Sequence, residues 1–208
     1  MKGKNYIKML LPLIALDGEA AYLIYYTVHL GNLPPYDDWT AYNLSVVCFW
    51  SGHEMELLIW GIITAVVFVG FLLYIRFLSG EKLAGVAVAA VLAGAFLVVG
   101  VNIPYQQEAK DSLCSNAHIA CSLNAPLCLA GGLIAVTVRM LRRGVKSMVF
   151  MSIFLVAGLS GAALLVVKYG IITTTLEVYT ITALAFYMTV MALILLNRRY
   201  NRDNLTKN

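Results

Sequence analysis

The sequence predicts an all-α polytopic membrane protein, a bundle of six transmembrane helices with both termini in the cytoplasm. The first observation is composition: 61% of the 208 residues are hydrophobic, only 12% are charged, and the mean hydropathy is +0.80. In soluble domains about a quarter of all residues are charged. The second is a series of apolar runs of about 20 residues, the length that crosses roughly 30 Å of hydrocarbon. The third is an uneven distribution of cations along the chain.

The apolar runs are separated by charge, proline or glycine, and each is expected to be one helix. No run is followed by enough polar sequence for a separate soluble domain. The sequence therefore predicts a single transmembrane domain, 1–208, with an outer loop at 29–55 and helices at 6–28, 57–77, 83–103, 117–138, 148–167 and 176–196.

The cations predict the orientation. If the N-terminus is cytoplasmic, only Lys110 and Lys168 of the fifteen lysines and arginines fall on the outer side. Short cytoplasmic loops are enriched in lysine and arginine. The net charge of +4 therefore reflects the orientation of the chain in the membrane, with a basic face beside anionic lipid. Membrane lipids rather than nucleic acid are the expected partners.

The first helix contains two acids, Asp17 and Glu19, in an otherwise apolar run. A charged group near the middle of a bilayer costs about 2.5–3.5 kcal/mol on the insertion scale, so such acids normally face the protein interior or water. Glu19 continues at helical spacing into Tyr22, Tyr26 and His29, which predicts a polar stripe open to the outside. We expect Glu19 to contribute to ligand binding and Asp17 to be structural.

The outer segments hold two cysteines, Cys48 and Cys114, at predicted helix ends. In an oxidising compartment two outer cysteines suggest a disulfide, and we expect this bond if the protein is made in a secretory pathway.

The fourth helix places His118 on one stripe with cysteines at 114, 121 and 128. Histidine and cysteine bind zinc or copper, and His53 with His118 could be the axial pair of a haem. However, cysteines spread over about 21 Å of helix cannot bind one ion, and buried cysteine is common in packed interiors. We therefore predict no cofactor, with haem or zinc or copper as the alternative.

Single residues along most of the chain carry a family resemblance: Leu11-Pro12, Pro35-Tyr36 with Asp37 and Asp38, Glu54 with Trp60 and Gly61, Tyr74 with Arg76, Asn102, His118 and Ile181-Thr182-Ala183. In these residues the chain resembles the six-span damage-regulated autophagy modulator (DRAM) family and its GPI-anchor-remodelling relatives. The chain departs from the family where His53 replaces a proline and where Phe186-Tyr187 replaces Glu-Trp. The resemblance implies a non-enzymatic protein of lysosomal, Golgi or plasma membranes that acts in autophagy or lipid handling.

These observations favour a lipid-interacting or membrane-trafficking protein without chemistry of its own, at the plasma membrane or an endomembrane. Its expected pocket is polar, opens outward between the first, second and fourth helices, and is lined by Glu19, Tyr22, Tyr26, His29, Glu54 and His118, while Asp17, Asn102, Cys48 and Cys114 are structural. A homo-oligomer or a membrane-protein partner is possible. Two alternatives remain open: a metal-binding or haem-binding redox subunit, and a proton-coupled transporter of small solutes that uses the two acids.

Overall fold

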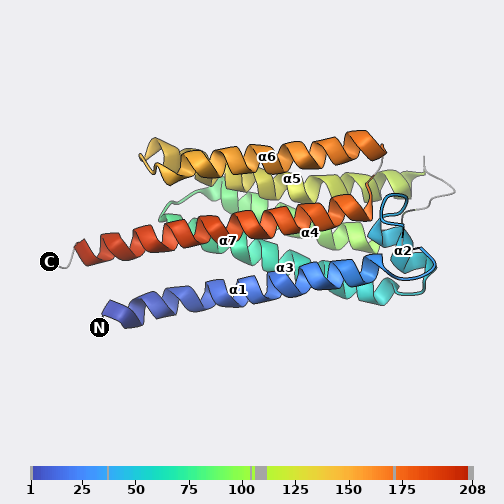
Figure 1. The fold of residues 1–208 in the computed structure, drawn as a ribbon, viewed down its shortest axis with the longest axis horizontal. Helices are drawn as coiled ribbons and strands as arrows, with labels where there is room; N and C mark the ends of the chain where they lie inside the picture. The colour runs from blue at the N-terminus through green and yellow to red at the C-terminus, as the bar shows by residue number, and fades with distance from the viewer. Residues whose placement is uncertain (1, 37, 104, 106–111, 171, 206–208) are drawn as a thin grey trace.

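The structure is a computed structural model that describes residues 2–36, 38–103, 105, 112–170 and 172–205. All regular structure in these ranges is helical, which confirms the predicted all-α class. The helices are α1 (Lys2–Gly31), α2 (Leu44–Trp50), α3 (Glu54–Ser79), α4 (Ala84–Asn102), α5 (Leu113–Arg142), α6 (Ser147–Tyr169) and α7 (Thr174–Leu205). All except the short α2 run along one bundle, and the two chain ends lie at the same end of it (Figure 1).

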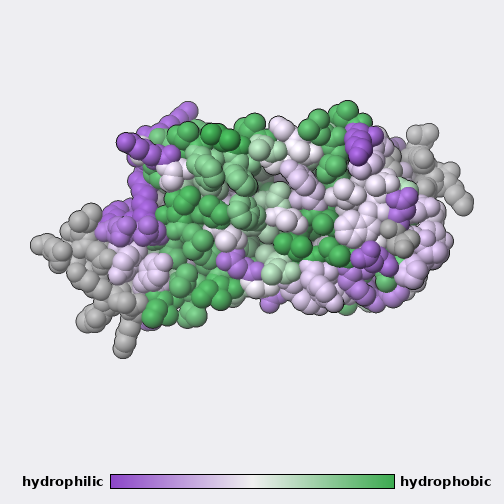
Figure 2. Space-filling model, viewed as in Figure 1, coloured by the Kyte–Doolittle hydropathy of each residue, from purple (hydrophilic) through white to green (hydrophobic). Residues whose placement is uncertain are grey.

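Five helices are long and apolar enough to cross a bilayer: α3, α4, α5, α6 and α7. The protein is therefore an integral membrane protein. Apolar side chains cover much of the middle of the visible face, and hydrophilic ones gather toward its two ends (Figure 2). The first helix is not among the five, so the predicted count of six spans is not reached by length and composition alone.

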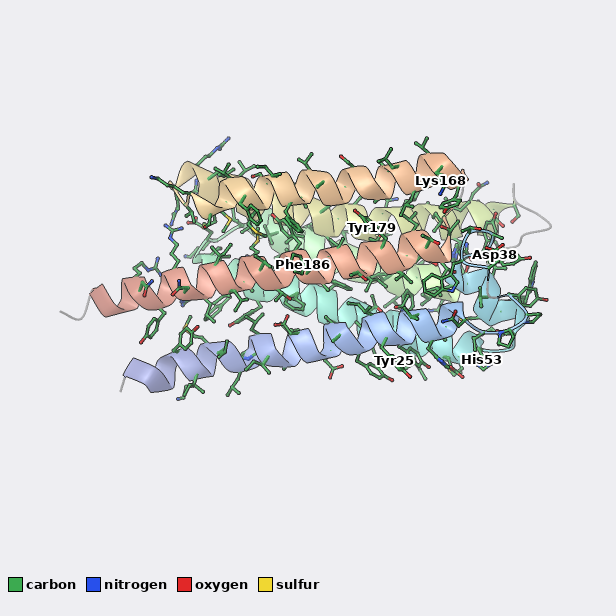
Figure 3. The ribbon with its side chains drawn as sticks, in the orientation of Figure 1. Tyr25, Asp38, His53, Lys168, Tyr179 and Phe186 are labelled. Atoms are coloured by element: carbon green, nitrogen blue, oxygen red, sulfur yellow. The ribbon has the colours of Figure 1, made fainter. Side chains whose placement is uncertain are left out.

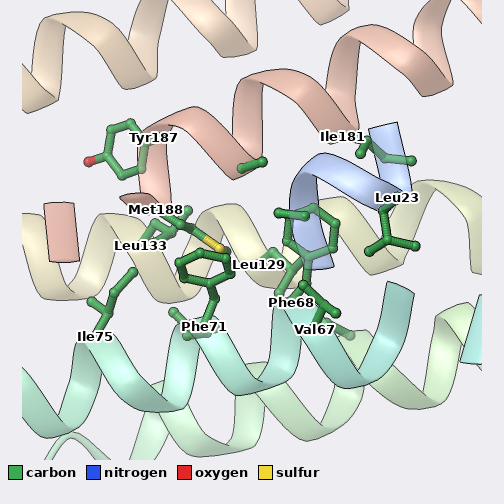
Figure 4. Packing of buried hydrophobic residues seen from close by; sticks show 14 of the residues in the cluster. Leu23, Val67, Phe68, Phe71, Ile75, Leu129, Leu133, Ile181, Tyr187 and Met188 are labelled. Carbon is green, nitrogen blue, oxygen red and sulfur yellow. The ribbon is translucent and has the colours of Figure 1, made fainter. Parts of the chain in front are cut away.

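The bundle is organised around α3, which contacts α1, α2, α4, α5 and α7. Its buried residues recur every three or four positions through the whole helix, the spacing that places them on adjoining faces. Phe68, Phe71 and Ile75 are fully buried, and they pack with Leu133 of α5 and Met188 of α7 (Figure 4). The core thus lies where α3, α5 and α7 meet.

One close helix approach in this core depends on a glycine. A Cβ atom added to Gly132 of α5 would lie 2.7 Å from a methyl carbon of Leu72 on α3, and Leu72 is itself fully buried. The neighbouring Gly131 has nothing within 4 Å of the same position. Of these two neighbours, Gly132 is therefore the one at a close helix contact.

The outer segment differs from the prediction, because it contains a helix where a loop was expected. Helix α2 begins after Asn43, whose side chain accepts the backbone N–H of Val46 at 2.9 Å, a typical N-cap. The preceding loop is attached to the start of α7, since the N–H groups of Thr174 and Thr175 donate to carbonyls of Tyr42 and Trp39 at 2.8 and 3.1 Å. These bonds hold α2 across one end of the bundle. Lys110 of the topology prediction and Asp37 of the family resemblance lie outside the described residues.

The two glycines allow a matched test of packing. We expect Gly132→Ala to lower the free energy of unfolding by about 1–3 kcal/mol, because the new methyl group displaces the buried Leu72. Gly131→Ala should be neutral or stabilise by up to about 1 kcal/mol through helix propensity. Thermal unfolding of both variants in detergent measures the difference, and equal behaviour would contradict the close approach.

Candidate functional site

A cavity of about 780 Å³ lies among α3, α4, α5, α6 and α7, with one residue of α2 at its end. This volume is in the range of about 300–1,000 Å³ that is usual for small-molecule sites. Most of its wall is apolar and includes Phe68, Phe96, Leu97, Leu127, Phe154, Leu159, Ala162 and Phe186. Tyr179 and Phe186 mark the α7 side of the cavity in Figure 3.

Three polar side chains from three helices, Ser45, His118 and Glu177, line the cavity at its α2 end. The hydroxyl of Ser45 lies 3.1 Å from Nε2 of His118. The carboxylate of Glu177 accepts the N–H of Leu44 at 2.8 Å, next to Ser45 in the chain. The cavity therefore has one polar end and an apolar body.

His118 is oriented by the end of α4. Its Nδ1 lies 2.7 Å from the carbonyl oxygen of Ile103 and 3.0 Å from that of Gly100. Carbonyls only accept hydrogen bonds, so Nδ1 carries a proton, and in the neutral ring Nε2 is the acceptor that faces Ser45. His118 thereby donates to carbonyls at the end of α4, where the usual helical N–H donors run out; the carbonyl of Gly100 also accepts the N–H of Ile103 at 3.2 Å.

Ser45 also lies 2.8 Å from Oδ1 of Asn43, so its single proton has two possible acceptors. If Nε2 of His118 gains a proton, it donates to Ser45, and Ser45 donates to Asn43. In that protonated state every polar atom of the row would have a hydrogen-bond partner. Chemically, this end of the cavity can donate to and accept from a polar head group.

The sequence did not single out Ser45 or Glu177. Ser45 is part of an Asn-Leu-Ser stretch in a predicted loop, and Glu177 is in the first turn of its helix, where acids are common. The one signal that could have identified Glu177 is a carboxyl close to the apolar run of the last helix. What made it part of a site is its contact with α2, 133 residues away.

The structure does not bring together all the residues of the pocket predicted on the first helix. Of its proposed lining residues only His118 lines the cavity, whereas Glu19, Tyr22, His29 and Glu54 are exposed. The buried face of α1 is apolar and packs against α3 and α7; it consists of Leu13, Ala20, Leu23, Thr27 and Leu30. Glu19 lies off this face, so the expectation that it shares a pocket with His118 is corrected.

Asp17 is the acid that contacts another helix. The hydroxyl of Thr189 on α7 donates to its carboxylate at 2.5 Å, which links α1 to α7. Tyr26, from the predicted stripe, donates instead to Glu56 of α3 at 3.0 Å. Asn102 donates to the carbonyl of Val98 in its own helix at 2.7 Å.

His53 and His118, the candidate metal ligands, are both engaged by protein atoms. Nδ1 of His53 lies 2.7 Å from the carboxylate of Glu56. Within the described ranges, no three histidine, cysteine, aspartate or glutamate side chains are grouped so that they could hold a metal ion.

The predicted disulfide is wrong. All four cysteines are free thiols; Cys48 is fully buried in α2, whereas Cys114 is exposed at the start of α5. Burial, with a smaller contribution from the carboxylate of Glu177, raises the pKa of Cys48 to about 12. Helix α2 and the start of α5 lie at the same end of the bundle, but the side chain of Cys48 is in the core and that of Cys114 is at the surface.

Comparison of the chain with protein-family models, with curated proteins and with solved structures finds no match. The resemblance to the DRAM family therefore stays a prediction.

The cysteines can be tested by labelling. At pH 8 we expect a maleimide to modify a variant that keeps only Cys114 at least tenfold faster than one that keeps only Cys48, because Cys48 is buried and its raised pKa leaves little thiolate. Mass spectrometry of the folded protein in detergent measures the rates. A Cys48–Cys114 crosslink in the oxidised protein would contradict the structure.

The two acids of α1 should differ in their effect on stability. We expect Asp17→Ala to lower the free energy of unfolding by about 1–3 kcal/mol, because it leaves the partly buried Thr189 hydroxyl without its acceptor. Asp17→Asn keeps an acceptor oxygen and should be milder. Glu19→Ala is the matched control on the exposed face and should stay within about 0.5 kcal/mol of the parent. Thermal unfolding in detergent measures all three, and a larger loss for Glu19→Ala would reverse the two roles.

Proposed function

We propose that this integral membrane protein binds a lipid-like amphiphile in the cavity, with the polar group at Ser45, His118 and Glu177 and the chain in the apolar body. The observation that carries the proposal is that one continuous cavity joins a hydrogen-bonding end to a wall of apolar side chains. A ligand that is polar at one end and apolar over the rest of its length matches both parts.

The charges of the lining select the head group. Among the described residues that line the cavity there is one carboxylate, Glu177, and no lysine or arginine. None of these residues offers a lysine or arginine to pair with an anionic head group, and burying an unpaired anion is costly. The favoured ligand is therefore an amphiphile with hydroxyl, amide or amine groups.

The proposed topology has six spans and cytoplasmic termini. Helix α1 has 30 residues, enough to cross a bilayer, and it packs along α3 and α7. Basic side chains gather at the end of the bundle that carries the termini, on α1, on the last turns of α3, α5 and α7, and on the turns that join α3 to α4 and α5 to α6. By the positive-inside rule this end is cytoplasmic, so the polar end of the cavity is exterior.

A role in lipid handling at a plasma membrane or endomembrane agrees with the resemblance to the DRAM family. The cavity supports the lipid-handling part of that role, because it supplies a site of suitable size and chemistry. A function in autophagy or at the lysosome is proposed on the resemblance alone.

Filling the cavity tests the proposal. We expect Ala162→Trp, which places an indole among the lining side chains of α6, to weaken binding of sphingosine or monoolein at least tenfold. Ser160→Trp is the matched control, because Ser160 is exposed on the same helix and does not line the cavity. Native mass spectrometry of the purified protein titrated with each amphiphile gives the bound fraction.

A change of charge at the polar end tests the choice of head group. Glu177→Gln keeps an acceptor for the N–H of Leu44 but removes the carboxylate. It should therefore weaken the binding of sphingosine and leave the binding of monoolein unchanged. Oleate should bind the parent more weakly than either. Equal binding to the parent and to Ala162→Trp would exclude the cavity as the site.

A further inference from the structure

A second cavity, of about 410 Å³, lies at the opposite end of the bundle from α2. It is formed where the turn between α3 and α4 meets the last two turns of α5. The turn contributes Glu81, Lys82 and Leu83, and α5 contributes Ala135, Val138, Arg139 and Arg142. We call this second cavity the basic groove, because three of its seven lining residues are cations.

The single acid of the basic groove is already neutralised. The side chain of Glu81 is only 7% exposed, and its carboxylate forms ion pairs with Arg139, at 3.2 Å, and with Arg143. Lys82 and Arg142 are exposed, and neither has an ion-pair partner among the described residues. Within the described part of the chain, the groove therefore has a surplus of positive charge that no ion pair compensates.

The floor of the basic groove is apolar and partly exposed at the protein surface. It is made of Leu83, Ala135 and Val138, and Val138 is 40% exposed. Exposed apolar side chains continue from this floor along α5, with Ile134 one residue before Ala135. A molecule seated here would have cations at one end and a bilayer-facing apolar surface along the rest of its length.

We propose that the basic groove binds an anionic phospholipid of the surrounding leaflet. Lys82 and Arg142 contact its phosphate, and one acyl chain lies over Ala135 and Val138. A guanidinium group donates two parallel hydrogen bonds to phosphate oxygens, and an ammonium group adds a compact charge. Basic pockets between transmembrane helices on the cytoplasmic side bind anionic head groups in this way.

Charge complementarity decides between a phospholipid of this type and a zwitterionic one. The choline of a phosphatidylcholine would place a cation near Lys82 and Arg142. The glycerol of a phosphatidylglycerol is neutral, so the phosphate charge of that lipid can be compensated by Lys82 and Arg142. The ion pairs of Glu81 hold Arg139, which lines the groove, and Arg143, which does not. The groove and the cavity at the α2 end thus differ in charge and in the head groups that they select.

The test is native mass spectrometry of the full chain released from nanodiscs that contain equal amounts of phosphatidylglycerol and phosphatidylcholine. The parent should retain phosphatidylglycerol in at least fivefold preference. Lys82→Gln with Arg142→Gln should reduce that preference to near unity. The matched control, Lys8→Gln with Lys146→Gln, removes two exposed cations from the same end outside the groove and should keep the preference.

An equal loss of the phosphatidylglycerol preference in both double variants would overturn the proposal. It would show that the overall positive charge of this end of the bundle, and not a specific site, attracts the anionic lipid. Ala135→Trp keeps every charge but fills the floor, so it should also abolish the preference; an unchanged preference would exclude the groove. Inorganic phosphate at millimolar concentration should leave thermal unfolding unchanged. Stabilisation by phosphate alone, lost in Lys82→Gln with Arg142→Gln, would show a site for free phosphate instead of a lipid.

Discussion

The hydrogen bond between the N–H of Leu44 and the carboxylate of Glu177 is the contact on which the polar end of the molecule depends. It pairs a backbone donor at the start of α2 that has no partner within its own helix, and it ties α2 to α7. Helix α2 then carries Ser45 to His118 on α5, and His118 reaches the carbonyls at the end of α4. Four helices are thereby joined by one chain of hydrogen bonds in a setting where an unpaired polar group is costly.

The apolar part of the molecule follows a different constraint, which is close packing around α3. Large side chains of α3 fill the space between α1, α5 and α7, and small residues such as Gly132 let neighbouring backbones approach. Helix α6 is the least buried of the five spanning helices and packs only against α5 and α7 among its principal neighbours. The cavity exists on this side because α6 covers the bundle without filling it.

Charge separates the two ends of the bundle. The end near α2 has carboxylates and hydrogen-bonding groups, including Glu56 with His53 and Tyr26, whereas the end with the termini is rich in arginine and lysine. Glu81, the one acid that lines the basic groove, forms ion pairs with two arginines. The two proposed lipid sites would therefore differ in the head groups that they select, and the proposed bilayer orientation rests on the same asymmetry.

The amino-acid sequence determined that this is a helical membrane protein with its basic residues at one end. Composition, the length of the apolar runs and the order of charges are properties of the chain itself and do not depend on how the helices pack. Tertiary structure alone decided which face of each helix is buried. Apolar residues lie on every face of a membrane helix, so helical spacing showed that Glu19 and three aromatic residues form a stripe. It did not show that Glu19, Tyr22 and His29 are exposed while Tyr26 bonds to Glu56 of α3. For the same reason Cys48 and Cys114 could be placed at one surface but not at bonding distance. The site at Ser45, His118 and Glu177 joins residues up to 132 positions apart, and such a meeting is set by how the helices pack, which no local pattern of the sequence contains.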